Sequence, residues 1–192
     1  FDGRPIGGGY DVGADETLGA GVVVTPGGNL TTTFNYTGTT GGSTNVIIPP
    51  AAITGSITGT VNVYYSTIST ASITTPLPSR LILSGDPFEL DAFSGDELNA
   101  TPIVTFSAPV TITIHYTESE LGGINEQTLK LYRLEYPPFG TGWCAIGVCR
   151  PLESQTLDVD NNIITATVLG FSKWGKYGAQ YPYDLFLPII VK

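Results

Sequence analysis

The chain has 192 residues, of which 24 are Gly and 26 are Thr, and only 13% carry a charge, about half the share in an ordinary globular domain. This length allows one all-β domain whose core hides roughly 70% of the unfolded surface. A net charge of −9 with only eight basic residues excludes a basic face for nucleic acid. No apolar run approaches the roughly 20 residues of a transmembrane helix.

Residues 1–20 contain six Gly and no regular apolar pattern, so we expect an N-terminal arm there. From residue 21 onward, short apolar or alternating runs recur between turn signals. They cover residues 21–25, 29–37, 44–50, 60–65, 80–85, 88–93, 102–106, 109–117, 128–136, 155–160 and 162–171. Many short strands at this spacing predict an all-β fold, an antiparallel β-sandwich over residues 21–178.

Three segments carry more detailed predictions. In 109–117 apolar residues alternate strictly with Thr and His115, which predicts a strand with one buried and one solvated face. In 128–136 the apolar phase shifts after Leu131, which predicts a β-bulge near Leu131–Tyr132. Residues 117–120 have capping-box spacing, and because Gly122 and Gly123 follow, we expect at most one helical turn.

The two cysteines, Cys144 and Cys149, are separated by four residues that include Gly147. Such a loop can bring the two sulfurs within bonding range. The alternative is half of a metal site, but His115 is the only His and there is no further Cys. We therefore expect a disulfide, which fits a secreted chain. The start at Phe1 without Met also leads us to expect a processed chain that has lost a signal peptide.

The C-terminal segment 179–192 differs from the rest, because seven consecutive apolar residues precede Lys192. They are Leu185, Phe186, Leu187, Pro188, Ile189, Ile190 and Val191. The run is too short to cross a bilayer and would promote aggregation if it were exposed. We expect it to form a buried strand, and Pro188 restricts that strand to an edge position.

Catalysis finds little support in the residue types. His115 is expected on a polar strand face, and both cysteines are expected to be bonded, which leaves no thiol nucleophile. Five carboxylates gather between residues 86 and 97, and paired carboxylates across a cleft could hydrolyse glycosides. However, Glu89 and Asp91 should share one strand face, so surface solubility explains the group better. The group consists of Asp86, Glu89, Asp91, Asp96 and Glu97. We predict that the protein is not an enzyme and uses no cofactor.

A calcium site is the remaining metal hypothesis, since Asp158, Asp160 and Asn161 offer hard oxygen ligands. The segment 158–162 lacks the Gly and the distal Glu of an EF-hand loop, and a hairpin turn accounts for all its residues. An intramolecular Lys–Asn crosslink would need a buried Lys next to a carboxylic acid. Only Lys130 is expected within a strand, with its side chain pointing away from the core, which argues against a crosslink.

Two further surface features would fit an extracellular location. Asn29, Asn35 and Asn99 each begin an acceptor triplet for N-linked sugars, although chance alone would produce such triplets in a Thr-rich chain. Trp143 and Trp174 could form a sugar-binding platform, but core packing or strand-end packing is the more frequent role of a single Trp.

A resemblance to a known family rests on four segments, residues 44–55, 86–98, 106–135 and 159–178. Their order is similar to that in ZU5-like β-sandwich modules of secreted and surface-attached bacterial proteins. In those modules a "P-A-G-A" segment precedes a "P-V-T-I-T-I-Y" strand and a closing "v-t-a-F-S" strand. Pro50-Ala51-Ala52 has Ala in place of the usual Gly. The resemblance implies a β-sandwich fold and an extracellular or cell-surface location.

Some ZU5-linked proteins cleave themselves at a His-Phe-Ser triad. This chain has Gly170-Phe171-Ser172, so the resemblance does not imply that activity. The LPII-K ending also resembles the short tails of exported bacterial proteins, in which an "L-P-L" segment precedes a hydrophobic stretch and a basic residue. It lacks the LPxTG sortase signal.

These observations lead to one main hypothesis and one alternative. The main hypothesis is a structural subunit of an extracellular filament or surface polymer, in which copies join head to tail because the apolar strand of one adds to a sheet of the next. The alternative is that the strand folds back on its own subunit, giving a monomeric secreted adhesion or carbohydrate-binding module. In neither case do we expect nucleic acid as a partner.

Overall fold

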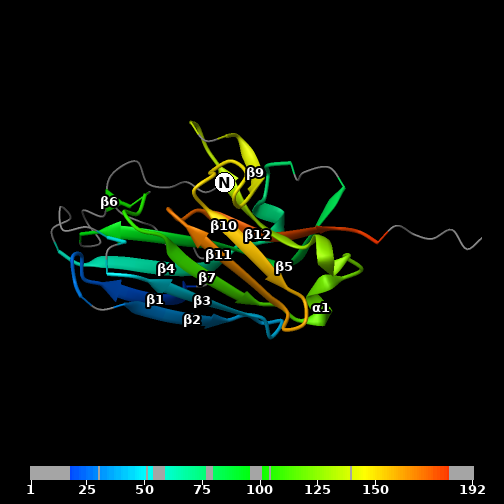
Figure 1. Cartoon of the computed structure of the whole chain (residues 1–192), viewed down its shortest axis with the longest axis horizontal. Coiled ribbons are helices and arrows are strands. Elements are labelled where there is room, and N and C mark those ends of the chain that lie inside the picture. Colours follow the sequence, from blue (N-terminus) through cyan, green and yellow to red (C-terminus); the bar gives the residue numbers. More distant parts are fainter. Residues whose placement is uncertain are drawn as a thin grey trace, which may run out of the picture.

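The computed structural model describes residues 18–29, 31–50, 52–53, 59–76, 80–95, 101–103, 105–138 and 140–181. These residues form two packed antiparallel sheets, so the predicted all-β sandwich is confirmed. Figure 1 shows the two layers face to face, with the single turn of α-helix at one end of the molecule. No helix among these residues is long and apolar enough to cross a membrane.

The five-stranded sheet follows the sequence patterns closely. Its order is β10-β11-β7-β3-β2. The strands are β2 (Thr32–Thr37), β3 (Ser43–Ile48), β7 (Val110–His115), β10 (Ser154–Asp158) and β11 (Ile163–Val168). The pairing of all five is continuous. Apolar side chains of β7, such as Ile112, face the core, while Thr111, Thr113 and His115 face outward, as the alternation predicts.

The seven-stranded sheet is less regular. Its order is β1-β4-β5-β12-β8-β9, and β6 pairs with β5. The strands are β1 (Leu18–Val24), β4 (Val61–Thr67), β5 (Leu81–Ser94), β6 (Thr101–Pro102), β8 (Lys130–Glu135), β9 (Gly142–Ala145) and β12 (Lys173–Ala179). Two predicted strands, 80–85 and 88–93, are one continuous strand, β5. The sequence patterns did not predict β9 or β12.

The core lies between the sheets and contains both aliphatic and aromatic side chains. A row of stacked aromatic rings crosses the core from Tyr36 through Tyr65 and Phe88 to Trp174, with centroid separations of 4.1, 5.0 and 6.4 Å. Offset stacking of this kind contributes beyond simple area burial. At the end of this row, the guanidinium of Arg133 lies 5.3 Å from the ring centroid of Trp174 and makes a cation–π contact with it.

The bulge predicted near Leu131–Tyr132 is wrong. β8 pairs in continuous register with β12 and with β9. The apolar phase shifts because the inward position after Leu131 is occupied by Arg133, which is buried, while Leu134 is buried from the opposite face of the strand. Register shifts in this sheet lie instead between β12 and β5, beside Gly85, whose φ is +62°, and between Leu18 and Gly21 of β1.

The predicted turns are present. Thr117 precedes the single turn α1 (Glu118–Leu121), and the carboxylate of Glu120 accepts a hydrogen bond from the Thr117 N–H at 3.3 Å. The one helical turn expected there is confirmed. Two 3₁₀ turns, Thr70–Ser72 and Glu126–Thr128, complete the helical segments of the described chain.

The first and last strands of the described chain extend slightly past the predicted boundaries of the β-sandwich domain. β1 begins at Leu18, inside the arm predicted over 1–20, and β12 ends at Ala179, one residue beyond the predicted boundary at 178. Beyond it, Gln180 bridges Ile124, and the Tyr181 N–H donates to the carbonyl of Gly123 at 3.1 Å. Residues 1–17 and 182–192 lie outside the described residues, and the predicted apolar strand at 185–191 is among them.

Candidate functional site

Of the residues considered for glycoside hydrolysis, the three that the structure describes all lie on β5. Glu89 and Asp91 extend from one face of β5, as predicted, and Glu89 pairs with Lys173 at 3.6 Å. Asp86 is exposed before the bend into this part of the strand, and Asp96 and Glu97 lie outside the described residues. Among the described members of the group, Glu89 and Asp91 share a strand face and therefore do not oppose each other across a cleft.

The segment considered for calcium is a hairpin turn between β10 and β11. Asp158 pairs with Ile163, and both carboxylate oxygens of Asp158 accept hydrogen bonds from Asn161, at 3.2 Å from the backbone N–H and 2.8 Å from Nδ2. Asp158 is therefore engaged within the turn. Within the described ranges, no three His, Cys, Asp or Glu side chains are grouped as metal ligands would be.

The remaining predicted positions are distributed over the surface and core. Cys144 and Cys149 form the predicted disulfide. Asn29 is exposed in the turn after β1, while Asn35 on β2 accepts a hydrogen bond from Asn45 at 2.5 Å. Asn99 lies outside the described residues.

The two tryptophans have different surroundings. Trp174 is fully buried, so it cannot be part of a sugar-binding platform. Trp143 is half-buried and packs edge-on against Tyr177, with ring centroids 5.2 Å apart. Both rings therefore pack against other residues of the protein.

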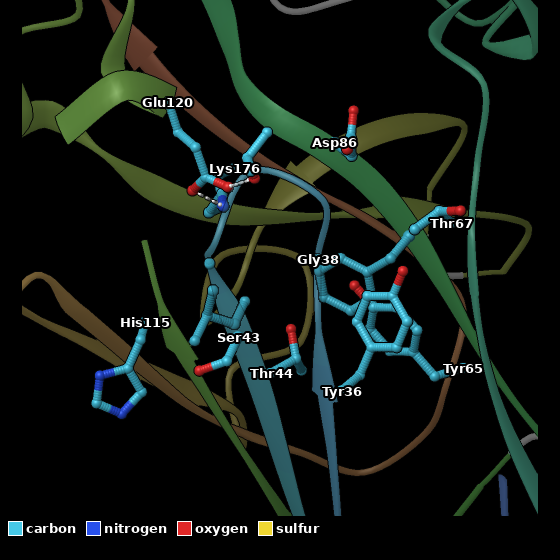
Figure 2. Close-up of a pocket in the computed structure, with 14 residues that line it drawn as sticks. Tyr36, Gly38, Ser43, Thr44, Tyr65, Thr67, Asp86, His115, Glu120 and Lys176 are labelled. Carbon is cyan, nitrogen blue, oxygen red and sulfur yellow. Dashed lines mark hydrogen bonds and ion pairs between the residues drawn. The ribbon is translucent and has the colours of Figure 1, made fainter. Parts of the chain in front are cut away.

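Two buried charge clusters were not predicted, and the first surrounds Lys176 on β12. Its ammonium group donates to Glu120 Oε2 at 2.7 Å, and Thr40 donates to the other oxygen of the same carboxylate. Figure 2 shows Lys176 and Glu120 meeting at one side of a small cavity, with the stacked Tyr36 and Tyr65 on its other side. The cavity has a volume of about 20 Å³, room for one water molecule.

Close backbone approach makes room for this ion pair. A Cβ on Gly42 would lie 2.7 Å from Glu120 Oε1, and a Cβ on Gly85 would lie 2.9 Å from Glu120 Cδ. Burial raises the pKa of Glu120, but the hydrogen bonds from Lys176 and Thr40 outweigh it, so the pKa lies below its ordinary value. Glu120 is thus ionised at neutral pH, and its contact with Lys176 links α1 to the centre of the seven-stranded sheet.

The expectation that only Lys130 lies within a strand is wrong, because Lys173 and Lys176 both belong to β12. Lys176 has the burial that a Lys–Asn crosslink would require. Its carboxyl neighbour is Glu120, whose lowered pKa makes it an ionised carboxylate in an ion pair with the ammonium and not the carboxylic acid that a crosslink would need. The contact therefore holds two charged groups together by electrostatics and hydrogen bonding.

The second cluster is centred on Arg133 on β8, whose side chain is 1% exposed. Nη2 of Arg133 lies 2.7 Å from Glu135 Oε1 and 2.9 Å from Glu153 Oε2, and Arg150 Nη2 lies 3.0 Å from Glu135 Oε2. Glu153 Oε1 also accepts the backbone N–H of Leu169 at 2.8 Å. Two arginines and two carboxylates thus neutralise one another where β8 meets the segment leading into β10.

Neither cluster is arranged for catalysis. Glu135, Glu153 and Glu120 are each at most 3% exposed in their side chains, and each is bonded to a cation. A general acid or base must reach a substrate proton, and these groups are enclosed by protein. Charges of this kind hold segments in a fixed geometry.

The surface features that remain are the sheet edges. β2 and β10 border the five-stranded sheet, and β1 and β9 border the seven-stranded one. An edge strand carries a row of unpaired N–H and C=O groups, and natural proteins usually protect it with charge, Pro or shortness. The seven residues of β1 contain no charged residue and no Pro, and Val23 is 57% exposed.

No protein-family model matches the sequence, and no curated protein is similar enough to count as a relative. The similarity to ZU5-like modules therefore stays a prediction from motifs.

Proposed function

We propose that the protein is a structural subunit of an extracellular filament or cell-surface polymer, and that copies join by β-strand addition. One observation carries the proposal. The apolar run 185–191 begins four residues beyond Tyr181, where the described part of the sandwich ends, and the edge strands β1 and β2 of that sandwich contain no charged residue. An extended segment that adds to such an edge gains main-chain hydrogen bonds and burial of its side chains.

The rigidity of the subunit supports this proposal. The Arg133–Glu153 and Lys176–Glu120 contacts join residues that are 20 and 56 positions apart in the chain, and the disulfide closes the local loop between Cys144 and Cys149. A filament transmits force through its subunits, so internal links of this kind suit a load-bearing block. The disulfide also favours an oxidising, extracellular location.

An alternative proposal is a monomeric adhesion or carbohydrate-binding module. The observation that favours it is a set of exposed large side chains around the disulfide. Tyr136, Val148 and Leu152 are 59%, 67% and 84% exposed, and the Arg150–Glu135 ion pair and the disulfide brace the same region. Exposed apolar residues on a rigid support are typical of interaction surfaces.

Deleting residues 182–192 from the chain tests the main proposal. The cut follows Tyr181, so β12 and the hydrogen bond from Tyr181 to Gly123 stay intact. We expect the full chain to form polymers in electron micrographs and sedimentation, and the shortened chain to remain a folded monomer by circular dichroism. A full chain that stays monomeric, or polymers that persist after the deletion, would contradict it.

Glycan-array binding by the monomer, abolished in Tyr136→Ala and unchanged in the tail deletion, would instead support the adhesion module. Tyr64→Ala is a matched control, since Tyr64 is also partly exposed but lies on β4, away from the disulfide region.

A further inference from the structure

We infer that the edge of β1 in one copy accepts residues 185–191 of another copy as an added strand. This inference depends on the proposed function, and it specifies the acceptor site. The regular part of β1 is Gly21–Val24, which pairs with Val61–Tyr64 of β4, and in the described chain no strand lies on its other side. The acceptor is therefore an edge of the seven-stranded sheet.

The β1 edge is apolar on both of its faces. Val22 and Val24 point inward and pack against the core. Val23 points outward and is 57% exposed, beside Gly21, which lies against the ring of the partly exposed Tyr64. Side chains of an added strand alternate between the two faces, so a strand beside β1 meets apolar surface at every position. The run 185–191 is apolar at every position.

The other edges do not match the run in this way. On β2 the outward side chains are Thr33, Asn35 and Thr37, all exposed. On β10 the outward side chains are Ser154, Thr156 and Asp158, also exposed. A strand added to either would place half of its apolar side chains over a polar face. β9 is a strand of four residues, whereas β1 has seven.

Pro188 restricts the added strand further. Alternate residues of a strand direct their N–H and C=O groups toward opposite neighbours, and Pro has no N–H to donate. Beside β1 the added strand becomes the new edge, so Pro188, Phe186 and Ile190 can direct their backbone outward. Leu185, Leu187, Ile189 and Val191 then direct theirs toward β1. The missing donor of Pro188 costs nothing in that arrangement.

The length of the chain indicates that donor and acceptor belong to different copies. Ala179 and Gly21 lie on β12 and β1, which are separated by β5 and β4. The registers place them about 26 Å apart along the strands and three strand spacings, about 14 Å, across the sheet. The direct separation is therefore about 30 Å.

The tail is too short to close this distance within one subunit. Leu185 is four residues beyond Tyr181 and reaches at most about 14 Å from it, and Val191 reaches at most about 35 Å when fully extended. Only the last residues of the run could touch Gly21–Val24 of the same subunit. Full pairing requires a second copy, and because donor and acceptor surfaces differ, the contact is heterologous and can propagate.

The experiment combines an acceptor variant with a donor deletion. Val23→Lys, in the full chain, places a charge on the acceptor edge at an exposed position, and Thr33→Lys is the matched control on β2. We expect Val23→Lys to lower the polymer mass in sedimentation at least tenfold and Thr33→Lys to leave it unchanged. Circular dichroism verifies that both variants are folded.

Mixing the variants separates the two levels of the proposal. Val23→Lys keeps its donor and the 182–192 deletion keeps its acceptor, so together they should form dimers that stop growing. If the deletion abolishes polymers but Val23→Lys polymerises normally, the acceptor assignment is overturned and strand donation survives. If the deletion has no effect, strand donation itself fails.

A second readout does not depend on a charge being tolerated. Full chains carrying Val23→Cys and Ile190→Cys, mixed under mild oxidation, should form an interchain disulfide, whereas Thr33→Cys with Ile190→Cys should not. Crosslinking at Thr33 in place of Val23 would assign the acceptor to β2 and contradict the inference.

Discussion

The two sheets of this sandwich differ in the kinds of side chain that they bury. In the five-stranded sheet, every inward side chain of β3, β7 and β11 is uncharged and buried, and the outward row is mostly Thr, Ser and Asn. The seven-stranded sheet buries Arg133 and Lys176 at inward positions and covers part of its outer face as well, where Tyr177 is fully buried. One sheet is specified by alternation of apolar and polar residues, and the other by particular contacts.

The difference determines how each sheet should respond to mutation. A pattern is spread over many similar residues, so no single outward position in the five-stranded sheet carries much of the stability. A buried ion pair depends on both partners, and removing one leaves an uncompensated charge in the interior. Stability should therefore be concentrated in a few residues of the seven-stranded sheet.

The largest effect is expected for Arg133→Met. The substitution leaves Glu153 buried without its cation and removes one of the two arginines that hold Glu135. Breaking a buried pair in this way costs about 3–5 kcal/mol in the free energy of unfolding, measurable by urea denaturation. Lys130→Met, at an exposed position of the same strand, is the control and should change stability by less than about 0.5 kcal/mol. Equal losses in both variants would show that the Arg133 cluster does not concentrate stability.

Glu120→Gln should cost about 3 kcal/mol at neutral pH, because Lys176 keeps a hydrogen-bond acceptor but loses its counter-charge. The pKa of Glu120 is lowered by folding from about 4.5. Its ionised form therefore adds stability above pH 4.5, and this contribution disappears as the pH falls through the lower folded pKa. The wild type and the variant should thus converge in stability below pH 4.5.

The control for the pH effect is Glu118→Gln on the same helical turn, since Glu118 is exposed. Urea titrations between pH 3 and 7 follow both variants. A difference between wild type and Glu120→Gln that stays constant down to pH 3 would mean that the charge of Glu120 does not act through Lys176.

The same contrast explains what could be predicted from the sequence. β7 and β11 were predicted because each presents apolar and polar residues alternately to two different environments. β12 was not predicted, since its central residues are Gly175, Lys176, Tyr177 and Gly178. None of these indicates a buried strand by itself. These residues can form a buried strand only because they contact residues that are distant in the sequence.

The buried charges were beyond prediction for a related reason. Glu120 lies 56 residues from Lys176 in the chain, and Glu153 lies 20 residues from Arg133. Local patterns identify a charged residue but not its partner, so Arg133 disturbed the apolar phase of β8 and suggested a bulge. One local signal did exist, because the capping-box spacing at Thr117 placed Glu120 at a defined position on α1.

A smaller effect is expected for Gly178→Ala. A Cβ at this position would lie 2.4 Å from Cγ2 of the buried Ile124 and 3.4 Å from the Cα of Leu129. Forcing an extra methyl group into packed surroundings costs about 1–3 kcal/mol, seen as a lower denaturation midpoint. Gly38→Ala is the matched control beside the five-stranded sheet, because a Cβ there meets only ordinary contacts from 3.4 Å outward. Similar costs at both positions would remove the proposed reason for Gly in β12.

The smallest effect is expected for Thr113→Ala, at the centre of the outer face of the five-stranded sheet. Thr113 stands between Thr165 on β11 and Asn45 on β3, and cross-strand pairs of this kind contribute about 0.2–1 kcal/mol. A loss of about 0.5 kcal/mol, measured in urea on the monomeric tail deletion, would fit a solvated face. If the loss rises above 2 kcal/mol in the assembled full chain but not in the monomer, this face is covered on assembly. Strand addition at β1 would then not be the only contact between copies.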